Sequence, residues 1–141
     1  MDFLQERKSI LHSHFRRKYF TGEKGENVAL PGKLHTVNPI ANDFFPIYKE
    51  NAREYTLLRT KEFGEVIAME VGALLVGKIV NHPGAASVRR GQEKGYFQFG
   101  GSTVVMLLKK DAAILDADIL ENSGNGIETV VKFGEKIGIA R

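Results

Sequence analysis

The chain has 141 residues, of which 43% are hydrophobic and 26% charged, which is typical of one globular domain and not of a disordered chain. Cysteine is absent, which excludes disulfides, thiolate metal sites and a cysteine nucleophile, and fits a cytosolic protein. A net charge of +3 is too small to indicate a nucleic-acid partner, and the sequence predicts neither a membrane-spanning helix nor a secretory signal.

The N-terminal stretch carries an uneven charge. Residues 7–20 contain basic side chains and no acidic one. Leu4, Leu11, Phe15 and Tyr19 are spaced so that a helix would place them on one face, which predicts a basic amphipathic helix. Such a helix either lies on an anionic lipid surface or packs on the domain through its apolar face. The basic residues are Arg7, Lys8, Arg16, Arg17 and Lys18.

The rest of the chain indicates strands. Residues 20–27 are predicted to form a loop, and Val28–Leu30 and Leu34–Val37 to flank a turn at Pro31-Gly32. A short helix is expected within residues 44–51, and residues 126–137 have helical spacing but could also contain strand. We therefore predict an α+β fold, mainly β, with a single flattened-barrel or sandwich-like domain over residues 1–141 and short helices. The remaining expected strands are Glu54–Arg59, Glu65–Glu70, Ala73–Val80, Tyr96–Phe99 and Thr103–Lys109.

The four histidines do not predict a metal site. His12 and His14 would point to different faces of a helix, so they would not share a metal ion there. His82 precedes a proline in a turn, and His35 lies in an expected strand, where a structural role is the default. The sequence also lacks the glycine-rich phosphate loops and the zinc-protease motif.

Gly100-Gly101-Ser102-Thr103 alone indicates only a tight turn before a strand. Its surroundings, residues 91–105, resemble the region around the self-cleavage site of the phosphatidylserine decarboxylase family. Further segments resemble that family in the same order, so that the resemblance covers about residues 28–141. These segments are Leu34–Pro39, Glu50–Arg53, Val71–Ile79 and residues 121–138.

The resemblance implies a zymogen that cleaves itself between Gly101 and Ser102. The Ser102 hydroxyl can attack the Gly101 carbonyl, because glycine has no side chain to block the approach and tolerates a strained backbone. Elimination from the resulting ester leaves dehydroalanine, which hydrolyses to a pyruvoyl group at a new N-terminus. The family's pyruvoyl group forms a Schiff base with the substrate amine and accepts the electrons released with CO₂.

The resemblance further implies a lyase that converts phosphatidylserine to phosphatidylethanolamine, with the pyruvoyl group made from Ser102 as its cofactor. The substrate implies peripheral contact with the cytoplasmic face of a membrane, and no nucleic acid; a homo-oligomer stays open. Counting back without gaps from Pro31-Gly32, His14 falls on the first histidine of a family motif, which makes it an acid/base candidate. The family's aspartate and second histidine find no counterpart, so residues 1–20 are expected to be a divergent start.

Two other classes of function stay open. Val88, Gly91, Gly95 and Phe97 are reminiscent of lipoyl- or biotinyl-carrier modules, but those need a lysine beside a methionine, which this chain lacks. The second alternative is a truncated, non-catalytic lipid-binding remnant of the decarboxylase family. Whether the chain cleaves itself distinguishes this remnant from the enzyme.

Overall fold

The computed structural model of the chain describes residues 3–7, 14–17, 21–36, 46–74, 78–98, 102–132 and 135–141, and the side chains of residues 3–7, 14–17 and 47–48 are not described. Its largest element is a six-stranded antiparallel sheet with the strand order β1-β9-β5-β4-β3-β7. Its strands, in that order, are Phe3–Arg7, Thr103–Leu108, Gly64–Val71, Arg53–Thr60, Gly22–Leu30 and Ala86–Val88.

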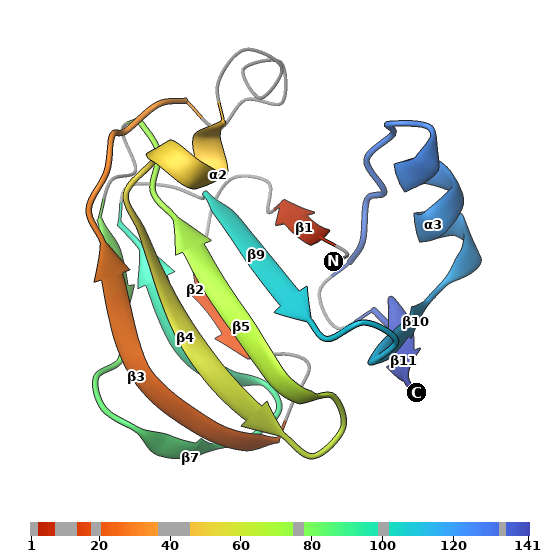
Figure 1. Cartoon of the computed structure of the whole chain (residues 1–141), viewed down its shortest axis with the longest axis horizontal. Coiled ribbons are helices and arrows are strands. Elements are labelled where there is room, and N and C mark those ends of the chain that lie inside the picture. Colours follow the sequence, from red (N-terminus) through yellow and green to blue (C-terminus); the bar gives the residue numbers. More distant parts are fainter. Residues whose placement is uncertain are drawn as a thin grey trace.

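A second, three-stranded sheet packs against this one. It consists of β2 (His14–Arg17), β8 (Gln92–Phe97) and β6 (Ile79–Asn81), in that order. The short helix α2 (Ile47–Glu50) lies at one end of the large sheet, close to the start of β9 (Figure 1). The domain is therefore a two-sheet β structure with short helices, which confirms the predicted mainly-β fold class.

The β4–β5 hairpin forms the centre of the large sheet and follows the sequence pattern closely. Buried residues alternate with partly exposed ones along both strands, as expected for strands with one face on the core. The turn between them ends at Gly64, whose φ of +66° is a left-handed conformation that glycine adopts without strain. The Thr60 hydroxyl donates to the Gly64 carbonyl at 2.9 Å and accepts from the Phe63 amide at 2.9 Å.

The core between the two sheets contains apolar side chains at one end of the strands and polar or charged side chains at the other. Near the β4–β5 turn it is apolar, with Leu58, Val66 and Ala68 buried and Met106 and Leu108 packed against them. Toward the opposite end of the same strands the buried side chains are polar or charged. They include Thr56, Glu70 and Lys94.

The predicted N-terminal amphipathic helix is wrong, because residues 3–7 and 14–17 are strands. β1 pairs with β9 and β2 pairs with β8, so sheet hydrogen bonds across long sequence distances override a helical period read from four apolar residues. The predicted loop over residues 20–27 is also wrong. β3 begins at Gly22, where an added Cβ would lie 1.9 Å from the Arg59 carbonyl oxygen, so glycine marks a close strand contact there.

The C-terminal residues form a separate small unit beside the sandwich. The helix α3 covers Ala117–Gly124, which precedes the helical spacing of residues 126–137, and β10 (Ala113–Leu115) pairs with β11 (Gly138–Ala140). This unit lies on the β9 side of the large sheet, and α3 buries none of its residues (Figure 1). Among the described residues, no helix is long and apolar enough to cross a bilayer.

Two further predicted strands are only partly present. Residues 34–36 form no strand, and the neighbouring Lys33 makes a single parallel bridge to Asn51. Within the expected strand Ala73–Val80, only its end belongs to a strand, β6, while residues 75–77 lie outside the described part.

Candidate functional site

Ser102 lies directly before β9, at the end of the large sheet nearest α2. Its hydroxyl donates a short hydrogen bond of 2.5 Å to the carbonyl oxygen of Val71, the last residue of β5. The next residue, Thr103, pairs with Val71 across the sheet, and both are buried. The half-buried hydroxyl is therefore held at a fixed place, at the junction of the two central strands.

The other two predicted site residues are described only in part or not at all. Gly101 lies outside the described residues, as do residues 99 and 100. His14 belongs to β2, where its backbone pairs with Tyr96 of β8, the strand that leads toward Ser102. His14 therefore belongs to the three-stranded sheet, whereas Val71 belongs to the six-stranded sheet. The side chain of His14 is not described.

Asn51 joins three segments next to the acceptor of the Ser102 hydroxyl. Its side chain is fully buried and its amide nitrogen donates to the carbonyls of Gly72 (2.7 Å) and His35 (2.9 Å). Its amide oxygen accepts from the His35 backbone N–H at 3.1 Å, and the Gly72 N–H donates to Ala52 at 2.7 Å. Sequence reasoning placed Asn51 in a family block without giving it this role.

Ionisable side chains also lie at this end of the domain. His35 is one-third exposed, and its Nε2 is 3.5 Å from a carboxylate oxygen of Glu50. The same oxygen lies 3.2 Å from the Lys33 ammonium. These groups surround the Asn51 junction and not the apolar part of the core.

A buried polar network connects the two sheets close to Ser102. The Lys94 ammonium of β8 lies 2.7 Å from a Glu70 carboxylate oxygen of β5 and 2.6 Å from the Asn81 amide oxygen of β6. The Asn81 amide donates to Glu54 of β4 at 2.5 Å and to Glu70 at 3.1 Å. We call Glu54, Glu70, Asn81 and Lys94 the buried polar network.

The network takes two charged groups out of water. Glu70 is 0% and Lys94 3% exposed, and the second Glu70 carboxylate oxygen is buried without a hydrogen-bond partner. Burial raises the pKa of the Glu70 carboxyl, although Lys94 and Asn81 act in the opposite direction. Sequence reasoning missed this network. The signal was present, because Glu70 continues the two-residue spacing of the buried residues Val66 and Ala68.

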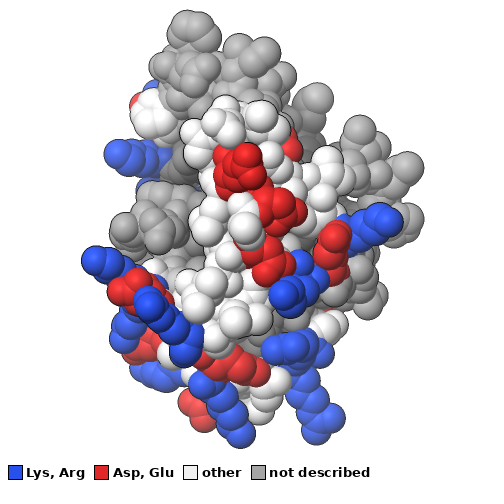
Figure 2. Space-filling view, turned by 90° about the vertical axis from the view of Figure 1, so that its right-hand side faces the viewer, with Lys and Arg blue, Asp and Glu red and all other residues white. Residues whose placement is uncertain are grey.

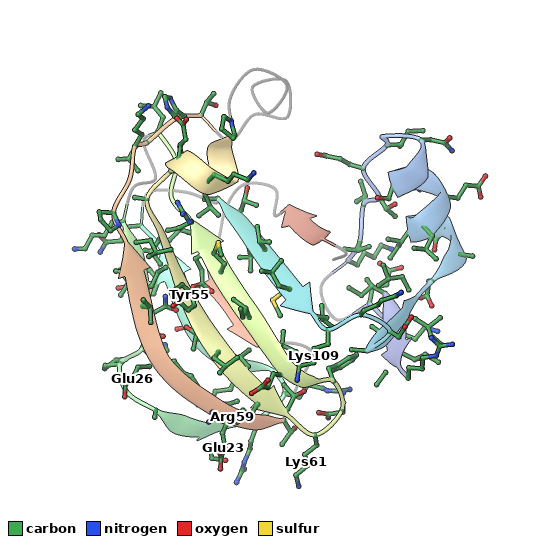
Figure 3. All side chains as sticks on the ribbon, viewed as in Figure 1. Glu23, Glu26, Tyr55, Arg59, Lys61 and Lys109 are labelled. Carbon is green, nitrogen blue, oxygen red and sulfur yellow. The ribbon has the colours of Figure 1, made fainter. Side chains whose placement is uncertain are left out.

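The opposite end of the sandwich is rich in exposed cations. Arg59, Lys61 and Lys109 lie there in Figure 3, and Lys and Arg side chains gather at the lower end in Figure 2. Glu65 bonds to Lys109 at 3.0 Å, and Lys109 lowers the pKa of the Glu65 carboxyl. β9 runs from Ser102 to this end, so six residues of strand, roughly 20 Å, separate the basic end from the candidate site.

Within the described ranges, no three histidine, aspartate or glutamate side chains are arranged to hold a metal ion. Ser102 offers a different chemistry, because its hydroxyl is ordered at the start of a strand and a serine hydroxyl can act as a nucleophile.

Comparison with known proteins agrees with the segments around Ser102. The sequence profile of the phosphatidylserine decarboxylase family matches residues 2–139. The chain belongs to the phosphatidylserine decarboxylase family. The family resemblance that the sequence segments predicted is thereby confirmed.

Curated relatives are similar over most of this chain. Phosphatidylserine decarboxylase proenzyme 2 of Clostridium acetobutylicum is 57% identical over 107 residues, which are 76% of this chain and 36% of the relative. The proenzyme of Clostridium novyi is 44% identical over 80% of this chain and 39% of its own length. That of Fusobacterium nucleatum is 42% identical over 83% and 40%. The chain thus spans about two fifths of the length of these relatives, and no solved structure matches it.

Proposed function

We propose that this chain is a pyruvoyl-dependent phosphatidylserine decarboxylase that activates itself by cleavage between Gly101 and Ser102. The observation that carries the proposal is the Ser102 hydroxyl, held by the Val71 carbonyl at the start of β9 in a chain of this family. The similar proteins are named proenzymes, which is consistent with a precursor that is processed.

The cleavage needs only groups of this chain and water. Ser102 Oγ bonds to the Gly101 carbonyl carbon, and the Gly101–Ser102 amide breaks to leave an ester. Loss of the Ser102 α-proton then expels the Gly101 carboxylate and leaves dehydroalanine. The dehydroalanine tautomerises to an imine. Water then hydrolyses this imine, which releases ammonia and leaves the pyruvoyl carbonyl.

The Val71 carbonyl orients the nucleophile before attack. As the acceptor at 2.5 Å, it holds the hydroxyl proton on the β5 side of Ser102. Because the hydroxyl is held in one rotamer, less conformational entropy is lost on reaching the transition state, which lowers the barrier to cleavage. We assign His14 as the acid/base candidate, because β2 places its backbone beside the strand that precedes the cleavage site.

The pyruvoyl group would supply a carbonyl that forms a Schiff base with the serine amine of the lipid and accepts the electrons released with CO₂. The product would be phosphatidylethanolamine. Because the acyl chains of the substrate stay in a bilayer, we place the protein peripherally at the cytoplasmic membrane face.

The end of the sandwich that carries Ser102 fits such a surface. Leu34 and Leu74 are 44% and 59% exposed there, and the Leu74 N–H donates to the His35 carbonyl at 3.1 Å, which joins their two loops. Exposed Lys49 and Lys78 lie at the same end. Apolar side chains beside cations are suited to the boundary of an anionic leaflet.

Replacing the nucleophile tests the proposal directly. Ser102→Ala removes the attacking oxygen, so the variant should stay one chain of 141 residues on a denaturing gel and by intact mass. The wild type and the control Ser87→Ala, an exposed serine on β7, should give fragments of residues 1–101 and 102–141. Normal cleavage of Ser102→Ala would remove Ser102 from this role. A wild-type chain that never cleaves would favour the non-catalytic lipid-binding remnant.

A further inference from the structure

The buried polar network occupies only one end of the core. The inward face of β5 carries Val66 and Ala68 near the β4–β5 turn and Glu70 near its other end. Ser102 lies just beyond that other end, where its hydroxyl reaches the residue that follows Glu70. The core thus changes from apolar to charged at the end where the candidate nucleophile lies.

Stability alone does not account for a charged pair at this place. Removing two charges from water costs free energy that their attraction repays only in part, and well-packed apolar side chains usually serve a core at least as well. Glu70 and Lys94 are almost completely buried, and one Glu70 oxygen has no hydrogen-bond partner. Unlike apolar packing, hydrogen bonds are directional, so the network can fix the positions of the strands relative to one another.

The strands that the network joins are those that meet at Ser102. Glu70 belongs to β5, which ends at the Val71 carbonyl that accepts the Ser102 hydrogen bond. Lys94 belongs to β8, which ends at Phe97, a few residues before Ser102. The 2.7 Å contact between Glu70 and Lys94 therefore connects β5, which carries the acceptor carbonyl, to β8, which precedes Ser102 in the sequence.

We propose that Glu70 and Lys94, bridged by Asn81, are positioning residues that hold the Val71 carbonyl and the end of β8 in register for self-cleavage. This inference rests on the proposed function, and it adds residues that act through the strands they hold. It predicts that the network governs the rate of processing more than the stability of the fold.

The test replaces the charged pair with apolar side chains of similar size. Glu70→Leu/Lys94→Met removes both charges of the buried ion pair together, so the variant should keep a thermal unfolding midpoint close to that of the wild type. Its self-cleavage, followed on denaturing gels after cell-free synthesis, should be at least ~10-fold slower, because small misplacements of reacting groups cost large factors in rate. Cleavage at the wild-type rate in a folded double variant would overturn the proposal.

A matched control makes the same substitutions at the other end of the large sheet. Glu65 and Lys109 form an exposed pair at 3.0 Å next to the β4–β5 turn, far from Ser102. Glu65→Leu/Lys109→Met should cleave at the wild-type rate. Equal slowing in both double variants would show a general effect of lost charge and would count against positioning.

A milder variant covers the case in which the apolar pair does not fold. Asn81→Ser removes the half-buried amide that bonds to both Glu70 and Lys94, and leaves both charges and their direct contact in place. It should slow cleavage in the same direction by a smaller factor. Unchanged cleavage in folded Asn81→Ser would contradict the inference.

A readout without cleavage separates this inference from the proposed function. In the uncleaved precursor, amide hydrogen exchange at Gly72 and Thr103 should be faster in the apolar double variant than in the wild type, with Leu57 and Ile67 unchanged. A purely structural role would raise exchange at all of these amides. If the wild type never cleaves, the proposed function fails, and unchanged exchange at Gly72 and Thr103 would then overturn the positioning as well.

Discussion

Two ionisable residues, one in each sheet, have candidate roles at Ser102, His14 as an acid/base group and Glu70 as a positioning residue. His14 is in β2, and the ladder to β8 fixes its backbone beside Tyr96, although the local register shifts just after it, between Phe15 and Arg16. A β-bulge at such a place bends the strand and can redirect a side chain toward a site. Glu70 lies in the large sheet, behind the carbonyl that holds the Ser102 hydroxyl.

The role of His14 can be tested by substitution. His14→Ala should slow self-cleavage or decarboxylation by ~10²-fold, the lower limit of usual general acid–base contributions. Imidazole added to the buffer should restore part of the rate, while a parallel His82→Ala variant should behave as the wild type. His82 is the suited control because it is half exposed and pairs with Glu93 at 3.0 Å, away from Ser102. Wild-type rates in His14→Ala would make His35 the next candidate.

The pH dependence of folding should carry the signature of Glu70. Because burial raises its pKa, the folded chain binds this proton more tightly than the unfolded chain. The contribution of Glu70 to stability is then complete below its ordinary pKa of 4.5 and is lost as pH rises through the raised value.

Urea unfolding of the wild type and Glu70→Gln between about pH 4 and about pH 8 measures this loss. The free energy of unfolding of the wild type relative to the variant should fall as pH rises, by about 1.4 kcal/mol for each unit by which the pKa is raised. A relative stability that stays constant or grows with pH would show that Lys94 outweighs burial at this carboxylate.

Sequence reasoning found the elements that are marked by patterns within their own residues. β4, β5 and β9 follow two-residue alternation with a glycine turn, and α2 begins next to Pro46, so their positions match the prediction closely. The N-terminal strands could not be found this way, because β1 and β2 exist through partners about 80 to 100 residues away. Helical spacing of a few apolar residues carries less weight than such pairing.

The candidate site divides in the same manner. Ser102 could be proposed from the sequence, because glycine and serine before a strand and the flanking family segments are contiguous there. The Val71 acceptor, the Asn51 junction and the Glu70–Lys94 pair were not, since each joins segments that only the fold brings together. The one local sign was Glu70, a charged residue at an inward position of an alternating strand. Its partner Lys94, on the other sheet, gave no such sign.

The two ends of the sandwich differ in their exposed side chains and in the polarity of the core beneath them. The end near the β4–β5 turn exposes Arg59, Lys61 and Lys109 (Figure 3) over an apolar core. The Ser102 end exposes Leu34 and Leu74 over a polar core. A bilayer held at the basic end would be roughly 20 Å from Ser102, farther than the serine headgroup of a lipid extends from its leaflet. Membrane contact that serves decarboxylation should therefore occur at the Ser102 end.

Vesicle binding distinguishes the two ends. Residues 1–20 are unsuited to a deletion test, because removing them would remove the paired strands β1 and β2. Point substitutions at the surface avoid this problem. Leu34→Ser/Leu74→Ser should weaken co-sedimentation with vesicles rich in anionic lipid, because both leucines lose apolar contact at the headgroup boundary.

The matched change at the other end is Lys61→Ser/Lys109→Ser, which removes two cations from the basic surface. If the Ser102 end faces the bilayer, this variant should pellet nearly as the wild type does, and raised salt should release both by screening the remaining lysines, each of which contributes about 1 kcal/mol near an anionic leaflet. The reverse ranking, with binding lost in the lysine variant and kept in the leucine variant, would place the membrane at the basic end. In that case the lipid could reach Ser102 only after leaving the bilayer, and the proposed surface decarboxylation would have to be abandoned.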